Sequence, residues 1–222
     1  MASSSAQKLV AEAIGTFALT FAGTAACVVN DVSNGGVTII GVALSFGLVI
    51  MAMVYSIGDI SGAHMNPAVT VGLTLSGRHP AGSVVPYIFS QLMGAFAASI
   101  ILRLLFPAHP NLGATLPAGS FAQSFGLEII ITFFLMFVIL NVTSASKETG
   151  ALAGIAIGAT ITLGIIFAGL ISGASMNPAR SIAPALISGS LKGWWIYVTA
   201  PFVGAALAVF AFRAIRQPGS GK

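Results

Sequence analysis

The sequence contains very few charged side chains. Charged residues make up 6% of the 222, with nine Lys and Arg against five Asp and Glu. Soluble domains carry roughly 25% charged residues, so a soluble fold of this length could not cover its surface. The net charge of +4 is too small and too dispersed for a nucleic-acid-binding surface. With 56% hydrophobic residues, these shortages indicate an integral membrane protein that does not bind nucleic acid.

Cysteine is almost absent as well. Cys27 is the only one and lies in an apolar run, which excludes a disulfide framework and a cysteine metal site. No Ser-His-Asp order, phosphate-binding glycine loop or cluster of metal ligands stands out. We therefore expect a protein that is not an enzyme and that carries no cofactor and no metal.

Long hydrophobic runs, in contrast, are abundant. Six of them approach the roughly 20 residues that a helix needs to cross a bilayer. They cover 8–30, 36–57, 82–106, 119–142, 150–170 and 194–215. No clear cleavage site follows the first run, so we predict a retained helix there rather than a signal peptide.

One nine-residue segment occurs twice, about half a chain apart. Ile60-Ser61-Gly62-Ala63-His64-Met65-Asn66-Pro67-Ala68 is repeated as Ile171-Ser172-Gly173-Ala174-Ser175-Met176-Asn177-Pro178-Ala179. Asn is a preferred helix N-cap, and Pro is favoured at the first helical position. Each copy therefore predicts a helix start, followed by a short apolar stretch at 67–75 and at 178–187. At ~1.5 Å per residue, neither stretch crosses the ~30 Å hydrocarbon layer alone.

The two copies divide the chain into two repeats that form a single pore domain. The first repeat covers 1–110 and the second 111–222, each with three spans and one half-helix. An odd number of crossings places the second copy upside down in the membrane, which gives an inverted repeat. The segment that starts at Glu12 in the first span resembles the one that starts at Glu128 in the fourth, which supports this division.

The distribution of Lys and Arg predicts the orientation. With the N-terminus inside, six basic residues lie on the inner side and two on the outer side, which favours cytoplasmic N- and C-termini. The inner ones are Lys8, Arg78, Lys147, Arg213, Arg216 and Lys222, and the outer ones are Arg103 and Lys192.

Three ionisable residues fall within the predicted membrane core. Arg180 follows the second Asn by three residues, and a charge at this depth suggests a functional role. Glu12 and Glu128 could form a proton relay, but their symmetric placement favours structural braces that accept hydrogen bonds from the loop backbone. We expect His64 to be a hydrogen-bonded structural histidine.

Together, the paired Asn-Pro-Ala motifs, Arg180, the inverted halves and the repeated Glu resemble the aquaporin (major intrinsic protein) family along nearly the whole chain. The resemblance implies an all-α membrane protein, a right-handed bundle of six transmembrane helices plus two re-entrant half-helices. It also implies a homotetramer with one pore per subunit. Asn66 and Asn177 would be amide donors at the pore midpoint, within motifs completed by Pro67, Ala68, Pro178 and Ala179. Backbone carbonyls would line the pore at Gly62, Ala63, His64, Met65, Gly173, Ser175 and Met176, and Cys27 would lie away from it.

The family's narrow outer filter falls, by spacing from the two Asn residues, on Phe46, Ile165, Ala174 and Arg180. Water channels of the family usually place His where this sequence has Ile165, so the resemblance implies a wider or less polar filter. Plant nodulin-like members similarly pair an aliphatic residue with Ala. Members that conduct glycerol usually have Asp and a basic residue where this sequence has Ser181 and Ala185.

The expected function is a passive transmembrane channel for water, with small neutral solutes as further permeants, that excludes protons and ions. The alternative is a small-solute facilitator for glycerol, ammonia or a neutral metalloid acid, with water secondary. A secondary transporter would need ligands for a coupling ion, and only Glu12 and Glu128 could serve. The expected location is the lipid bilayer of the plasma (cell) membrane, as a multi-pass protein.

Overall fold

The computed structural model describes residues 3–144 and 150–216 of the chain. Lys147 and Lys222, which contributed to the predicted orientation, lie outside these ranges. Within them every regular element is helical. The elements are α1 (Ser5–Val32), α2 (Thr38–Ser61), α3 (Pro67–Leu75), the 3₁₀ turn η1 (Ala81–Ser83), α4 (Val84–Leu105), α5 (Phe121–Val142), α7 (Ala153–Ser172), α8 (Pro178–Ser188) and α9 (Trp194–Ile215).

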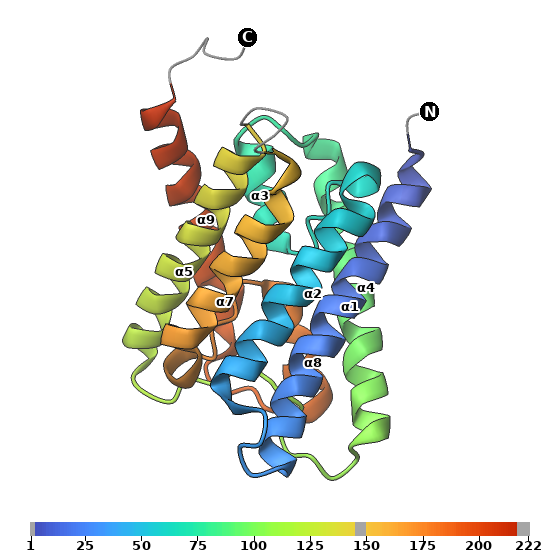
Figure 1. The fold of residues 1–222 in the computed structure, drawn as a ribbon, viewed down its shortest axis with the longest axis vertical. Helices are drawn as coiled ribbons and strands as arrows, with labels where there is room; N and C mark the ends of the chain where they lie inside the picture. Colours follow the sequence, from blue (N-terminus) through green and yellow to red (C-terminus); the bar gives the residue numbers. More distant parts are fainter. Residues whose placement is uncertain (1–2, 145–149, 217–222) are drawn as a thin grey trace.

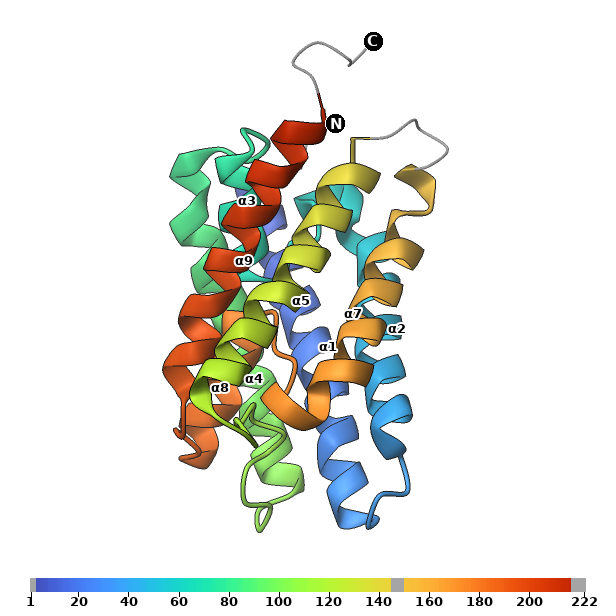
Figure 2. The ribbon, with the colours of Figure 1, turned by 90° about the vertical axis from the view of Figure 1, so that its left-hand side faces the viewer.

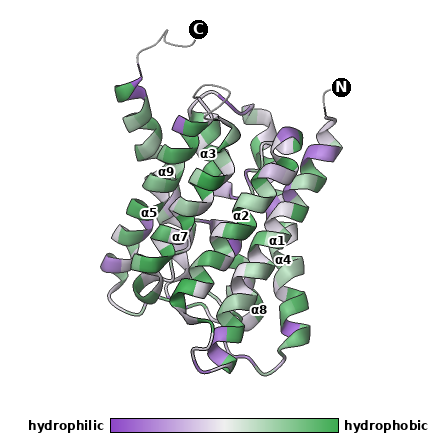
Figure 3. Cartoon of the chain, viewed as in Figure 1, coloured by the Kyte–Doolittle hydropathy of each residue, from purple (hydrophilic) through white to green (hydrophobic). Residues whose placement is uncertain are grey.

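Six of these helices are long and apolar enough to cross a membrane, as predicted. Their bounds agree with the predicted spans to within a few residues, and the two short helices α3 and α8 begin at the two predicted prolines. Large apolar side chains such as Val85, Leu170 and Phe210 are about three-quarters exposed, and hydrophobic residues predominate along the long helices (Figure 3). This outer surface suits contact with lipid chains rather than water.

The helices pack in matching pairs, with α1 against α4, α5 against α9, and α2 against α7. The two short helices lie toward opposite ends of the bundle, α3 on the side of the N- and C-termini and α8 on the other side (Figures 1 and 2). The six long helices thus surround two half-helices that lie toward opposite ends of the bundle, as the inverted repeat requires.

Glycines allow the helices of each pair to approach closely. A Cβ on Gly158 of α7 would lie 2.5 Å from the Gly47 carbonyl oxygen of α2. A Cβ on Gly94 of α4 would lie 2.1 Å from the Ala13 carbonyl oxygen of α1, and one on Gly204 of α9 would lie 2.4 Å from that of Ile129 in α5. Small residues at such crossings are how helices associate in lipid, where close packing replaces the hydrophobic effect.

Candidate pore and filter

Asn66 and Asn177 bring the two halves of the chain together in the middle of the bundle. Each is the N-cap of its short helix, and its Oδ1 accepts a hydrogen bond from the backbone N–H of Ala68 or Ala179. Each Nδ2 donates across to the other half. Asn66 Nδ2 donates to the Met176 carbonyl oxygen at 2.7 Å, and Asn177 Nδ2 to that of Met65 at 2.8 Å. The two helix N-termini, which carry partial positive charge, therefore meet at this point.

The loops before these asparagines have an unusual backbone conformation. Gly62 and Gly173 end α2 and α7 with φ of 89° and 84°. Ala63, Met65, Ala174 and Met176 also have positive φ, between 42° and 55°. A left-handed conformation costs a non-Gly residue about 1–3 kcal/mol and persists only where neighbouring structure holds it. Both loops therefore need anchors.

Two buried carboxylates provide these anchors. Glu128 accepts hydrogen bonds from the Ser175 and Met176 backbone N–H groups and from the Ser172 hydroxyl, at 2.8–2.9 Å. Glu12 does the same for the His64 and Met65 N–H groups and the Ser61 hydroxyl, at 2.7–2.8 Å. Both side chains have no exposed surface. This is the geometry that a structural brace requires.

Three further residues support the two loops, and the sequence did not lead us to expect this role for them. Tyr87 donates its hydroxyl hydrogen to the Ser61 carbonyl oxygen at 2.9 Å, and Tyr197 donates to that of Ser172 at 2.6 Å. Gln91 also donates to Glu12 at 2.8 Å. Their spacing could have indicated this role, because the two Tyr residues are separated by nearly the same number of positions as Ser61 and Ser172.

A cavity of about 290 Å³ passes along the two loops and contacts both asparagines. The predicted residues Gly62, Ala63, His64, Met65, Ser175 and Met176 line it, whereas Gly173 lines a second cavity at the end opposite the termini. His64 is buried, and its Nδ1 lies 3.1 Å from the Thr70 hydroxyl, as expected of a hydrogen-bonded histidine. The rest of the wall is mainly aliphatic, with Leu19, Ile50, Val69, Leu135, Ile157 and Ile161 among its residues.

The predicted filter lies where the two cavities meet. Phe46, Ile165 and Arg180 line both the first cavity and the second, which has a volume of about 260 Å³, while Ala174 lines the first. The Arg180 side chain is 3% exposed, and its guanidinium lies 5.0 Å from the centre of the Phe46 ring. Its Nη1 donates to the Gly113 carbonyl oxygen at 3.0 Å, and its Nε has no hydrogen-bond partner among the residues that the structure describes. A buried cation with N–H groups available for further hydrogen bonds therefore lies at the junction of the two cavities.

The expected place of Cys27 was wrong. It lines the second cavity, together with Arg180 and Asp31, and therefore lies beside the predicted filter. The loop at residues 106–120 packs against α1 here, since a Cβ on Gly113 would lie 3.1 Å from the Cys27 Cβ. The fold of this loop, which the sequence did not predict, encloses the cavity beside the thiol.

At the opposite end, Arg78 lines the first cavity and connects the end of α3 with the end of α5. Its Nη1 donates to the Leu140 carbonyl oxygen at 3.0 Å and to the Thr143 hydroxyl at 2.9 Å. Burial lowers the pKa of Arg78, and the nearby Arg216 lowers it further. The adjacent His79 also has a lowered pKa, because of burial and then of Lys8. Among the described residues, no group of three His, Cys, Asp or Glu side chains could hold a metal.

Comparisons with known proteins agree with this architecture. Residues 1–212 match the family model described as major intrinsic protein. The chain is 50% identical to aquaporin NIP1-1 of Zea mays, over 95% of this chain and 75% of that protein. It is 47% identical to nodulin-26 of Glycine max, over 95% and 78% of the two chains. A solved structure, the aquaglyceroporin from Plasmodium falciparum, superposes with a TM-score of 0.84 at 24% identity, over 96% of this chain and 97% of that one.

Proposed function

The chain belongs to the major intrinsic protein family, and from that membership we propose how it works as a channel for water and small neutral solutes. The cavity along the two Asn-Pro-Ala segments conducts these molecules passively and excludes protons and other ions. The two repeats, 1–110 and 111–222, act as a single pore domain. The family consists of channels rather than enzymes.

The meeting of the two asparagine amides carries this proposal. Each amide nitrogen carries two hydrogens. One of them is donated to the Met176 or Met65 carbonyl oxygen, so each asparagine keeps a second hydrogen that it can donate into the lumen. A water oxygen that accepts from both turns its own hydrogens away from the midpoint. A continuous hydrogen-bonded chain for protons is then interrupted, and the positive ends of α3 and α8 repel cations.

Loop carbonyls supply the acceptors along which water moves on either side of the midpoint. In this role we place the carbonyls of Gly62, Ala63, His64, Gly173 and Ser175. The Met65 and Met176 carbonyls already accept from the asparagines, so their part is to orient the amides. Glu12 and Glu128 act as braces for the two loops rather than as a proton relay.

Phe46, Ile165, Ala174 and Arg180 act as the filter. Arg180 repels cations through its fixed charge and donates hydrogen bonds to passing oxygens. Ile165 contributes no polar group and Ala174 leaves space, so hydroxylated solutes larger than water fit beside Arg180. Ser181 and Ala185 stand where glycerol-conducting members usually have Asp and a basic residue, which favours water as the first substrate.

The second candidate is a facilitator for which glycerol, ammonia or a neutral metalloid acid is the first substrate and water is secondary. The mainly aliphatic wall around Ile50, Ile157 and Ile161 favours it, because such a wall is well suited to the carbon side of a polyol and offers water few partners.

The channel is an integral multi-pass membrane protein. We further propose that it lies in the cell membrane with both termini cytoplasmic, because six of the eight basic residues outside the core follow that orientation. A homotetramer with one pore per subunit is the expected assembly, in which part of the apolar outer surface packs against neighbouring copies.

The test is stopped-flow light scattering of proteoliposomes under an impermeant osmotic gradient and, side by side, under a glycerol gradient, with empty liposomes as the baseline. Water permeability well above the baseline, with a low activation energy and no saturation, is expected. A parallel measurement with a proton gradient and a pH-sensitive dye is expected to show only background leak. Water flux equal to that of empty liposomes would overturn the channel proposal, and glycerol flux that exceeds water flux would favour the second candidate.

A further inference from the structure

The carbonyl that holds Arg180 belongs to a short, tightly folded loop. Leu112 and Gly113 both have left-handed backbones, with φ of 52° and 69°, and this conformation is unfavourable for Leu. Leu112 is fully buried and packs with Val28 and Leu102. The Gly113 N–H donates to the Asn111 side-chain oxygen at 3.0 Å. The position of the Gly113 carbonyl therefore depends on what keeps this strained turn in place.

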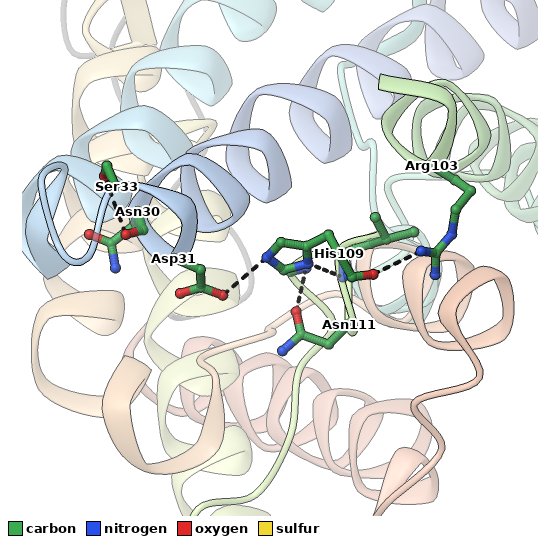
Figure 4. Close-up of polar contacts among 8 residues, drawn as sticks. Asn30, Asp31, Ser33, Arg103, His109 and Asn111 are labelled. Atoms are coloured by element: carbon green, nitrogen blue, oxygen red, sulfur yellow. Dashed lines mark hydrogen bonds and ion pairs between the residues drawn. The ribbon is translucent and has the colours of Figure 1, made fainter. Parts of the chain in front are cut away.

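His109 supplies one of these restraints. Its Nδ1 accepts a hydrogen bond from the Leu112 backbone N–H at 3.0 Å. A ring nitrogen that accepts from an N–H carries no hydrogen, so His109 is neutral and its hydrogen is on Nε2. Nε2 points to Asp31 Oδ2 at 3.4 Å (Figure 4), and it makes no shorter hydrogen bond.

Charged groups approach His109 from the helices on both sides. Asp31 at the end of α1 faces the ring, and the His109 carbonyl oxygen accepts from Arg103 of α4 at 2.8 Å (Figure 4). The Pro107 carbonyl oxygen accepts from the same Arg103 nitrogen at 3.1 Å. The His109 side chain is 4% exposed and that of Asp31 is 53% exposed. The carboxylate is thus in contact with solvent, and Asp31 also lines the second cavity, so it provides a path for a proton to the buried ring.

We propose that His109 is a positioning residue for the filter, because its hydrogen bond to Leu112 holds the Gly113 carbonyl against Arg180, and that protonation of His109 releases this restraint. The proposal rests on the role of Arg180 in the filter. A protonated ring carries a hydrogen on Nδ1, which then faces the Leu112 N–H donor, so the bond becomes a repulsive contact. The carboxylate of Asp31 stabilises the protonated ring.

Release of the Gly113 carbonyl changes the filter. Without the Gly113 carbonyl, the Arg180 Nη1 loses the protein acceptor that holds it against the loop. Water in the lumen is then the partner that replaces this acceptor, so the guanidinium moves further into the lumen at the junction of the two cavities. It then obstructs the narrowest section, and water permeability falls.

The test compares water permeability of proteoliposomes at about pH 5 and about pH 7.5, which bracket the range in which histidines titrate. The same pH on both sides of the membrane makes the result independent of the orientation of the channel. His109→Asn places an oxygen near the position of Nδ1 but cannot take up a proton, and His109→Leu removes the acceptor. The matched control is His79→Asn, at the other end of the pore.

The wild type is expected to lose roughly threefold or more in water permeability at the lower pH, a change within the scale of one hydrogen bond to a charged group. His109→Asn should stay high at both values, His109→Leu low at both, and His79→Asn should respond like the wild type. If His109→Leu fails to fold, His109→Asn still decides the outcome. A wild type that does not respond, a rise in acid, or a response that persists in His109→Asn or disappears in His79→Asn would overturn the proposal. Failure of the channel proposal itself is distinguishable, since the wild type would then show no permeability above empty liposomes at the higher pH.

Discussion

Glu128→Gln should destabilise the protein and lower its water permeability. Glu128 accepts three hydrogen bonds, two at Oε1 from Ser172 and Ser175 and one at Oε2 from Met176. Glutamine keeps one oxygen, which can serve Ser172 and Ser175, but its amide nitrogen then faces the Met176 N–H. One buried donor without a partner costs about 1–3 kcal/mol. Because the Met176 carbonyl holds the Asn66 amide, displacement of this residue also disturbs the pore midpoint.

The magnitude scales with the number of donors that lose a partner. Glu128→Leu leaves the Ser175 and Met176 N–H groups unpaired, at about 2–6 kcal/mol if each costs the same, whereas the Ser172 hydroxyl can still donate to the Ala168 carbonyl oxygen. This cost approaches the roughly 5–15 kcal/mol of total stability of a protein. Glu12→Gln provides the matched comparison. Although Glu12 holds four donors, one comes from Gln91. The Gln91 Oε1 has no partner within the described part of the chain and can accept from the new amide after rotation. The cost of Glu12→Gln should therefore not exceed that of Glu128→Gln.

The assay combines thermal unfolding in detergent with stopped-flow water permeability. At roughly 2–4 °C per kcal/mol for a protein of this length, Glu128→Gln should lower the unfolding temperature by about 2–12 °C. An unchanged unfolding temperature together with wild-type permeability would refute the brace. Proton-coupled uptake by the wild type that either glutamine variant abolishes would replace the brace with a proton relay.

Three further predictions concern the filter, the second cavity and the helix packing. Arg180→Val should raise proton leak in reconstituted vesicles, because the fixed charge at the junction of the cavities is lost, and leak at the level of the wild type would contradict its role. Mercurials should partly block water flux in the wild type but not in Cys27→Ser, and Ala174→Cys should be blocked more strongly. A fully insensitive Ala174→Cys would mean that the assigned filter positions are incorrect. Gly158→Leu should lower the unfolding temperature through an overpacking cost of about 1–3 kcal/mol, since its Cβ would lie 2.5 Å from the Gly47 carbonyl oxygen, whereas Gly126→Leu, with no atoms near its Cβ, should have little effect.

The six spans could be predicted from their hydrophobic runs, and the two short helices could be predicted from the repeated motif. Each copy of the Asn-Pro motif contains its own helix signal, so the starts of α3 and α8 needed no knowledge of the rest of the chain. Glu12 and Glu128 could be matched to the loops because a buried carboxylate needs donors and the loops are the segments that have them. Interactions of this kind can be predicted from sequence because both partners can be identified in it.

Contacts between the two halves could not be obtained in this way. The hydrogen bond from Asn66 to Met176 joins residues from different copies, and nothing in either copy alone specifies the partner. The loop from 106 to 120 has no counterpart in the repeat, so its strained turn at Leu112 and its contact with Arg180 depend on packing against α1. The role that we propose for His109 depends on that packing, so the sequence alone could not indicate it.

Cys27 shows why hydrophobicity gives little information about which face of a span lines a pore. In a soluble helix, the apolar face identifies the core, but in this protein lipid, helix contacts and much of the pore wall are all apolar. The informative pattern in α1 consists of three residues at intervals of four, all of which face the cavities or the filter. Leu19 lines the first cavity, Gly23 leaves room for the Phe46 ring, which a Cβ there would approach to 2.0 Å, and Cys27 lines the second cavity. Since residues four apart share one helix face, the position of any one of the three would have placed the thiol beside the filter.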